Sequence, residues 1–215
     1  MNQYVLEMIG IHKHFPGVHA LKGVDLRVKP GTVHGIMGEN GAGKSTLMKI
    51  AIGLYKPDAG TIRFKGEEVS FNSIHEALEK GISMIHQELS PLPYMTVAQN
   101  IFLGREFLNR WHLIDHKRID QEAEKILNEL EIPISPTRIM GELSVAQMQL
   151  VEIAEAVSRK AELVIMDEPT SALTEKEVEH LFEIIRNLKN RGVAVVYITH
   201  KMEELFKIRS EEHPS

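Results

Sequence analysis

Hydrophobic and polar positions along the chain follow two periods. Short apolar runs predict β-strands, and apolar residues at every third or fourth position predict amphipathic helices. We expect strands at 4–10, 24–28, 33–37, 61–64, 82–86, 162–167 and 193–199. We expect helices at 44–52, 74–80, 96–103, 119–130, 145–159, 175–190 and 201–207. This alternation predicts an α/β fold.

The strands differ in character along the chain. The runs at 162–167 and 193–199 are apolar throughout, as is typical of parallel strands that are covered on both faces. Strands from residues 1 to about 65 are expected to add an antiparallel edge. From about 88 to 160 the pattern gives helices but no convincing strand, which predicts an inserted α-helical subdomain. We expect a single domain over 1–208 and a disordered polar tail over 209–215.

Composition narrows the classes of function. The 215 residues are 43% hydrophobic and 26% charged, with a net charge of -5, so no global basic charge favours binding to nucleic acid. The absence of cysteine excludes a thiolate nucleophile and a Cys-based zinc site. No apolar run approaches the ~20 residues of a membrane helix, and the N-terminus does not resemble a secretory signal. We therefore expect any action at a membrane to be that of a soluble partner.

A phosphate-binding loop is the most specific motif. Gly38-x-x-x-x-Gly43-Lys44-Ser45 follows an apolar strand and opens a predicted helix, the context that such a loop requires. Backbone N–H groups and the helix dipole attract phosphate, Lys44 reaches the β- and γ-phosphates, and Ser45 ligates Mg²⁺. The alternative, a glycine-rich turn before an ordinary helix, leaves the lysine and the hydroxyl in register unexplained. The expected nucleotide contacts are Gly38, Asn40, Gly41, Ala42, Gly43, Lys44, Ser45 and Thr46.

Polar residues also follow three other predicted strands. Asp167 ends the strand 162–167, at the sheet edge where nucleotide phosphates lie, and would hold the metal. Glu168 is then placed to polarise an attacking water as a general base. Gln87 follows the strand 82–86 and would contact Mg²⁺ and water, and His200 follows 193–199 and would donate to the γ-phosphate. Each alone would more often be a solvated strand end, but the phosphate loop favours the catalytic interpretation.

A third motif, LSVAQ at 143–147, begins the helix predicted at 145–159. Ser144 and Gln147 predict a capping box, in which each side chain satisfies a backbone N–H of the helix start. The apolar positions behind them predict one buried face. By itself, this is an ordinary helix start.

The phosphate loop, Gln87, LSVAQ, DEPTSALT at 167–174 and His200, in this order, resemble the ATP-binding domain of an ABC transporter over residues 2 to about 208. The resemblance implies a P-loop NTPase fold with a RecA-like core sheet, binding ATP and Mg²⁺. The stretch 86–106 further resembles the monosaccharide-importer branch, of ribose, galactose or xylose type.

Several roles come from the resemblance alone. Two such domains pack head to tail in this family, so Ser144, Ala146 and Gln147 would contact a nucleotide held by the other domain. Phe15 would stack on adenine, although a loop aromatic that covers the core edge is the alternative. Ala146 stands where the superfamily usually has glycine, and its methyl group could hinder a close approach of the backbone to phosphate.

The resemblance thus implies an ATP-hydrolysing subunit, or the N-terminal half of a tandem one, that energises sugar import. The implied partners are a second nucleotide-binding domain, transmembrane permease subunits and, indirectly, a sugar-binding protein, with no nucleic acid. The implied location is peripheral, at the cytoplasmic face of the cell membrane. The alternatives are an isolated nucleotide-binding half without turnover and a non-transport ABC-type ATPase. No second nucleotide domain follows, so we expect a truncated product or an isolated domain; the sequence does not identify the sugar.

Overall fold

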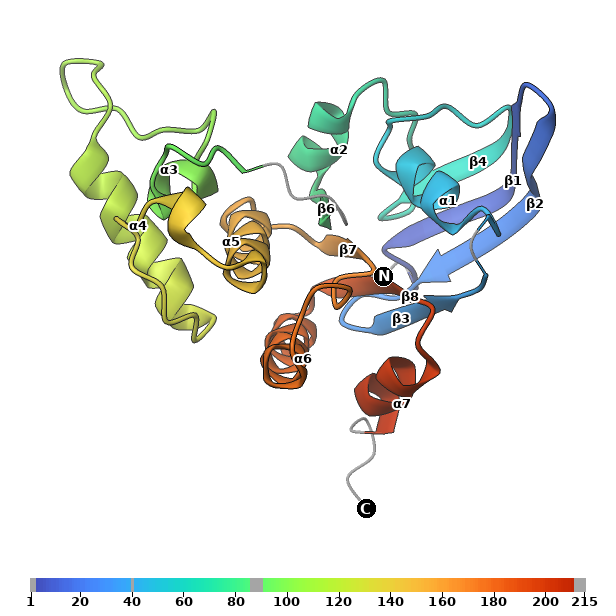
Figure 1. Ribbon diagram of the computed structural model, residues 1–215. Coiled ribbons are helices and arrows are strands. Elements are labelled where there is room, and N and C mark those ends of the chain that lie inside the picture. The colour runs from blue at the N-terminus through green and yellow to red at the C-terminus, as the bar shows by residue number, and fades with distance from the viewer. Residues whose placement is uncertain (1–2, 40, 86–90, 211–215) are drawn as a thin grey trace. The chain divides into compact units, whose positions relative to one another are not determined.

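The computed structural model describes residues 3–39, 41–85 and 91–210. They form two compact units, which we treat separately. The sheet unit comprises Met1–His86, Ala161–Pro169 and Ile185–Ser215, and the helical unit comprises Gln87–Lys160 and Thr170–Ile184 (Figure 1). The predicted α/β class is confirmed.

The first part of the sheet unit is an antiparallel sheet. It contains β1 (Leu6–Phe15), β2 (Val18–Val28), β4 (Ala59–Phe64) and β5 (Glu67–Glu68), in the order β2-β1-β4-β5. Antiparallel strands were expected from this part of the sequence, but β1 and β2 extend toward each other as one long hairpin in which Phe15 pairs with Val18. The predicted strands ended at residue 10 and resumed at residue 24, because the polar residues of the hairpin weaken the hydrophobic pattern on which strand prediction depends.

The second part of the sheet unit is a parallel sheet whose strands are followed by the predicted site residues. It contains β3 (Val33–Met37), β6 (Ile82–Ile85), β7 (Leu163–Asp167) and β8 (Ala194–Thr199), in the order β3-β8-β7-β6 with every neighbouring pair parallel (Figure 1). Every residue of β8 is buried, as its apolar run predicts. Because the strands are parallel, the segments that follow β3, β7 and β8 leave from one edge of the sheet.

Three helices lie wholly within the sheet unit: α1 (Lys44–Ala51), α2 (Ile74–Lys80) and α7 (Met202–Ser210). One hydrophobic core joins both sheets to α1; its members include Leu6, Met8, Met48, Ile165 and Val196. Helix α7 continues to Ser210, so the irregular tail expected from residue 209 does not begin there. Residues 211–215 lie outside the described residues.

The helical unit contains α3 (Val97–Ile101), α4 (His116–Glu129), a short 3₁₀ helix (Met140–Glu142), α5 (Val145–Ser158) and the first part of α6 (Glu175–Asn190). Helix α4 begins three residues before its predicted start because the Asp115 carboxylate accepts a hydrogen bond from the Arg118 N–H and caps it. Over residues 91–160 the structure contains two isolated β-bridges and no longer strand. None of the helices in the described part of the chain combines the length and apolar character needed to cross a membrane.

A half-buried histidine in β3 gives a testable pH dependence. Burial lowers the pKa of His34 below its ordinary value. Between the lowered pKa and the ordinary value of about 6.5, the unfolded chain therefore binds more protons than the folded chain. We expect burial of neutral His34 to cost no stability above about pH 6.5, and the free energy of unfolding to fall as the pH drops below this value.

Urea unfolding at about pH 7.5 and about pH 5.5 measures this effect, since these values bracket the ordinary pKa of histidine. His34→Gln should lose part of the acid sensitivity that the wild-type chain shows. His75→Gln is the matched control, because the His75 side chain is 76% exposed. Equal pH dependence in His34→Gln and the wild type would refute the prediction.

Candidate active site

The phosphate loop joins β3 to α1 and leaves the start of that helix without a side-chain cap. Gly41 and Gly43 have φ angles of 85° and 87°, in the left-handed region that favours glycine. Gly43 is the N-cap of α1, and no side chain caps this helix among the described residues. Side chains do cap α2, α3, α4 and α5. The N–H groups at the start of α1 are therefore available to an anionic ligand.

The close packing of Gly43 explains why the loop needs glycine there. A Cβ atom at this position would lie 2.7 Å from the Ala20 carbonyl oxygen and 2.8 Å from Leu21 Cδ2. Backbone and core would both have to move for a larger residue. The glycine thus sets both the left-handed turn and the approach of the loop to β2.

The Lys44 ammonium lies inside the loop. Its Nζ donates hydrogen bonds to the carbonyl oxygens of Gly38 and Glu39, at 2.6 and 2.9 Å. A cation held over an uncapped helix start fits phosphate by charge and by donor geometry. Ser45 and Thr46 follow in the first turn and are half-buried, while Asn40 lies outside the described residues.

The end of β7 carries the two predicted carboxylates. Asp167 is the last residue of the strand. Glu168 follows with a φ of 49°, an uncommon conformation for a residue with a Cβ atom. Its N–H donates to the Ile198 carbonyl oxygen of β8 at 3.0 Å, which holds the strained residue in place. Non-glycine residues in this region cost about 1–3 kcal/mol and gather at functional sites.

Glu168 and His200 contact each other directly. His200 Nδ1 lies 3.2 Å from Glu168 Oε1, and the two side chains are 55% and 18% exposed respectively. The carboxylate is therefore sheltered, and the imidazole faces solvent. Sequence patterns placed both residues at one sheet edge, but neither this contact nor the strained φ has a sequence signal.

Mg²⁺ would find oxygen ligands at the same edge. The Ser45 hydroxyl and the Asp167 carboxylate are of the type that Mg²⁺ prefers, and the ion usually adds waters and substrate phosphates to one or two such ligands. No group of three or more acidic or histidine side chains suited to a metal occurs among the described residues, which such a partly hydrated site does not require. Gln87, the third predicted ligand, lies outside the described residues.

Phe15 ends β1 and is half-buried. Its ring meets Tyr55 edge to face, with 5.3 Å between centroids, and the Lys13 ammonium lies 5.6 Å from its centroid. These contacts agree with an aromatic that covers the core edge. Adenine stacking by Phe15 stays a prediction.

In the helical unit, the capping box is confirmed. Ser144 Oγ accepts from the Gln147 N–H, and Gln147 Oε1 accepts from the Ser144 N–H, both at 3.2 Å. The Ser144 hydroxyl proton and the next N–H groups of α5 are not used by this box. The box therefore orients the serine without consuming every donor that a phosphate would need.

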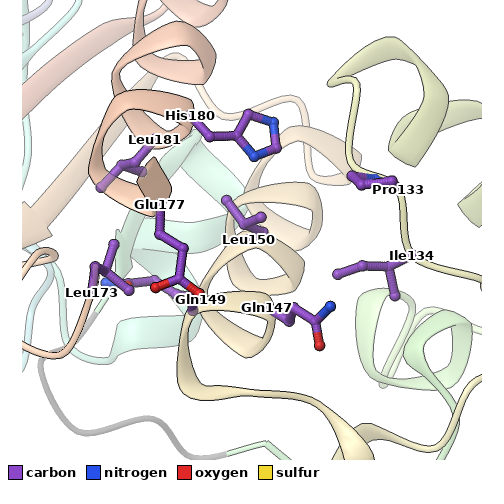
Figure 2. A pocket seen from close by; sticks show the side chains of 10 residues that line it. Pro133, Ile134, Gln147, Gln149, Leu150, Leu173, Glu177, His180 and Leu181 are labelled. Atoms are coloured by element: carbon purple, nitrogen blue, oxygen red, sulfur yellow. The ribbon is translucent and has the colours of Figure 1, made fainter. Parts of the chain in front are cut away.

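A pocket of about 180 Å³ lies behind this helix start (Figure 2). Figure 2 shows Leu150 of α5 together with Glu177 and His180 of α6 around a space that faces Pro133 and Ile134. Ala146 lines the same pocket and is only 6% exposed. The methyl group that replaces the usual glycine hydrogen is thus accommodated within the helical unit.

Comparisons with known proteins agree with this geometry. A family model described as ABC transporter matches residues 21–171. The chain is 60% identical over 209 residues to the putative ribose/galactose/methyl galactoside import ATP-binding protein of Halalkalibacterium halodurans, which covers 97% of this chain and 40% of the relative. It is 54% identical to the galactose/methyl galactoside import ATP-binding protein MglA of Escherichia coli O157:H7, over 97% of this chain and 41% of that one. The chain thus spans about two fifths of the length of these relatives.

Solved structures give the same result. A nucleotide-free ATP-binding cassette from an ABC transporter superposes with a TM-score of 0.84 at 30% identity, over 95% of this chain and 85% of that one. The structure of an ATP-binding cassette of an ABC transporter in its ADP conformation gives a TM-score of 0.84 at 30% identity, over 96% of this chain and 85% of that one. With the matched family model, the parallel sheet and the uncapped phosphate loop, these likenesses establish that the chain belongs to the ABC transporter family.

Proposed function

We propose that the chain binds ATP at the edge formed by β3, β7 and β8 and hydrolyses it when paired with a second nucleotide-binding domain. The observation that carries this proposal is the uncapped start of α1, which follows β3 in the chain, while the Glu168–His200 pair follows β7 and β8 of the same parallel sheet. An anion-binding helix start and a sheltered carboxylate at one sheet edge suit phosphoryl transfer to water.

The residues of the sheet unit divide the work. The loop N–H groups and Lys44 bind the phosphates, and Phe15 stacks on adenine. Ser45 and Asp167 would hold Mg²⁺, which supplies positive charge to the phosphates when it is bound. Gln87, which lies outside the described residues, stays a predicted third ligand. Glu168 accepts the proton of the attacking water. His200 contacts Glu168 and donates a hydrogen bond toward the γ-phosphate.

The helical unit supplies the other half of a site. Ser144, Ala146 and Gln147 at the start of α5 would contact a nucleotide held by the second domain, because a capped helix start with unused donors can still bind phosphate. The greater length of the relatives supports a second domain in the same assembly.

A concentration series of the purified chain with Mg·ATP tests the proposal. Turnover that depends on two domains rises faster than linearly with chain concentration. Linear turnover would contradict the requirement for pairing. ATP binding without turnover at any concentration would favour the alternative of a nucleotide-binding half that is inactive by itself.

We further propose that the assembly energises sugar import through membrane permease subunits, with a sugar-binding protein acting indirectly, at the cytoplasmic face of the membrane. The names of the relatives, which are import proteins for ribose, galactose or methyl galactoside, support this proposal. A non-transport ABC-type ATPase is the alternative.

An exposed apolar hairpin in the helical unit supports a protein partner. Leu108 and Ile114 form an isolated bridge, and Asn109 Oδ1 accepts from the Trp111 N–H at 2.8 Å, so the tip is ordered. Trp111 and Leu113 at this tip are 70% and 65% exposed. An exposed tryptophan beside aliphatic side chains is the kind of group that anchors an interface.

We predict that Trp111→Ser lowers the affinity of the chain for membranes that carry its permease subunits by at least about 10-fold, as expected for a buried aromatic anchor. Quantitative co-sedimentation measures this loss. Phe206→Ser is the matched control, because Phe206 is 61% exposed and belongs to the sheet unit. Equal binding of Trp111→Ser and the wild type would remove the hairpin from the interface.

A further inference from the structure

A buried carboxylate on α7 holds the end of β8. Glu204 is 6% exposed and lies in the first turn of α7. Its Oε2 accepts hydrogen bonds from the Tyr197 hydroxyl at 2.9 Å and from Thr199 Oγ1 at 2.8 Å. Its Oε1 lies 3.2 Å from Lys201 Nζ. A buried carboxylate destabilises a protein unless it is paired and hydrogen-bonded. These three contacts therefore hold the Glu204 side chain in one position.

The partners of Glu204 lie on both sides of His200. Thr199 comes directly before it and Lys201 directly after it. The Lys201 N–H also donates to Thr199 Oγ1 at 3.0 Å, which closes the turn at residues 199–201. Tyr197 and Thr199 are 0% and 2% exposed, so the anchor is inside the protein although His200 itself is exposed.

Glu168, the other member of the Glu168–His200 pair, is held by a separate contact. The Glu168 N–H donates to the Ile198 carbonyl oxygen, two residues before His200. The strained Glu168 is thus fixed to β8, and the turn that carries His200 is fixed to α7 through Glu204. Helix α7 in turn packs against β3 at Gly35, where a Cβ atom would lie 2.6 Å from Leu205 Cδ2.

We propose that Glu204 is a positioning residue that holds the His200 imidazole against Glu168. The catalytic consequence of this inference rests on the proposed function, in which His200 acts on the nucleotide and Glu204 acts only through His200. The geometry of the pair, however, can be tested without nucleotide.

The first test uses the isotopically labelled chain and NMR of histidine ring nitrogens. His200→Asn identifies the His200 resonances by their loss. Because Nδ1 lies 3.2 Å from the Glu168 carboxylate, Glu168→Gln should shift the Nδ1 resonance of His200. In a Glu204→Ala background this shift should fall to less than half. In a Glu204→Gln background it should persist, because an amide oxygen can still accept from both hydroxyls.

A shift that persists unchanged in Glu204→Ala overturns the proposal. If that variant does not fold, Thr199→Val is used instead. It is nearly isosteric and removes the hydroxyl that joins Glu204 to the turn. We expect the same loss of the Nδ1 shift there, and a retained shift would overturn the proposal equally. Glu203→Gln is the control, because Glu203 lies in the same first turn of α7 and its side chain is exposed.

The second test uses turnover under conditions in which the wild-type chain hydrolyses ATP. Glu204→Ala should lower kcat by about 10–100-fold, the cost of a small misplacement of a reacting group, and leave the Kd for ATP nearly unchanged. In a His200→Ala background the same substitution should have almost no further effect. An equal, additive loss in both backgrounds would indicate a general structural role and overturn the proposal. Absence of ATP binding by the wild type would refute the proposed function but leave the NMR test decisive.

Discussion

Glu168→Gln is expected to retain ATP binding while hydrolysis falls by roughly 10²–10⁴-fold, the usual contribution of a positioned base. Glutamine keeps the shape of the side chain and removes its ability to accept the proton of water. The structure gives this residue a sheltered carboxylate, 18% exposed, at 3.2 Å from His200 Nδ1. It also holds the backbone at a φ of 49°, an uncommon conformation for a residue with a Cβ atom that four other described non-glycine residues share.

Single-turnover hydrolysis and equilibrium binding of ATP measure the two halves of this prediction. Glu162→Gln is the matched control, because Glu162 directly precedes the same strand and its side chain is 47% exposed in an ion pair with Lys65. ATP that persists in Glu168→Gln should also favour the head-to-tail dimer, which size-exclusion chromatography detects. If Glu168→Gln hydrolyses ATP as fast as the wild type, the base lies elsewhere, and His200 is the next candidate.

Most of the elements and their order were predictable because they left a local signal, whereas the two-residue strand β5 was not predicted. The apolar runs of β7 and β8 indicate burial on both faces, and the structure buries every residue of β8. The phosphate loop combines glycine spacing, a lysine and a hydroxyl after a strand, so its position could be assigned before any tertiary contact was known. The capping box of α5 is likewise a short-range pattern, and its reciprocal hydrogen bonds are present.

Tertiary features had no such signal. The left-handed φ of Glu168 could not be predicted, because glutamate is not among the residue types enriched in this conformation. Glu204 looks like a solvated residue in the first turn of a helix until the hydroxyls of Tyr197 and Thr199 are seen to converge on it. The β1–β2 hairpin was underestimated because its polar, exposed positions weaken the hydrophobic alternation on which strand prediction depends.

Lys44→Ala is expected to weaken ATP binding by about 2–4 kcal/mol, because it removes charge-assisted hydrogen bonds to phosphate. This corresponds to a loss of affinity of roughly 30–1000-fold. In the structure Lys44 Nζ donates to the Gly38 and Glu39 carbonyl oxygens, so the ammonium already lies within the loop that would receive the phosphates.

Titration calorimetry of the chain with ATP measures the change, and Lys80→Ala is the matched control. Lys80 lies in the last turn of α2, its side chain is 57% exposed, and its nearest acidic partner, Glu67, is 3.9 Å away. Thermal unfolding of both variants separates lost contacts to phosphate from a collapsed loop, because Lys44 also ties two carbonyls of its own loop. A folded Lys44→Ala chain with unchanged affinity would rule out the phosphate-loop assignment, since none of the described side chains caps the start of α1 in place of a ligand.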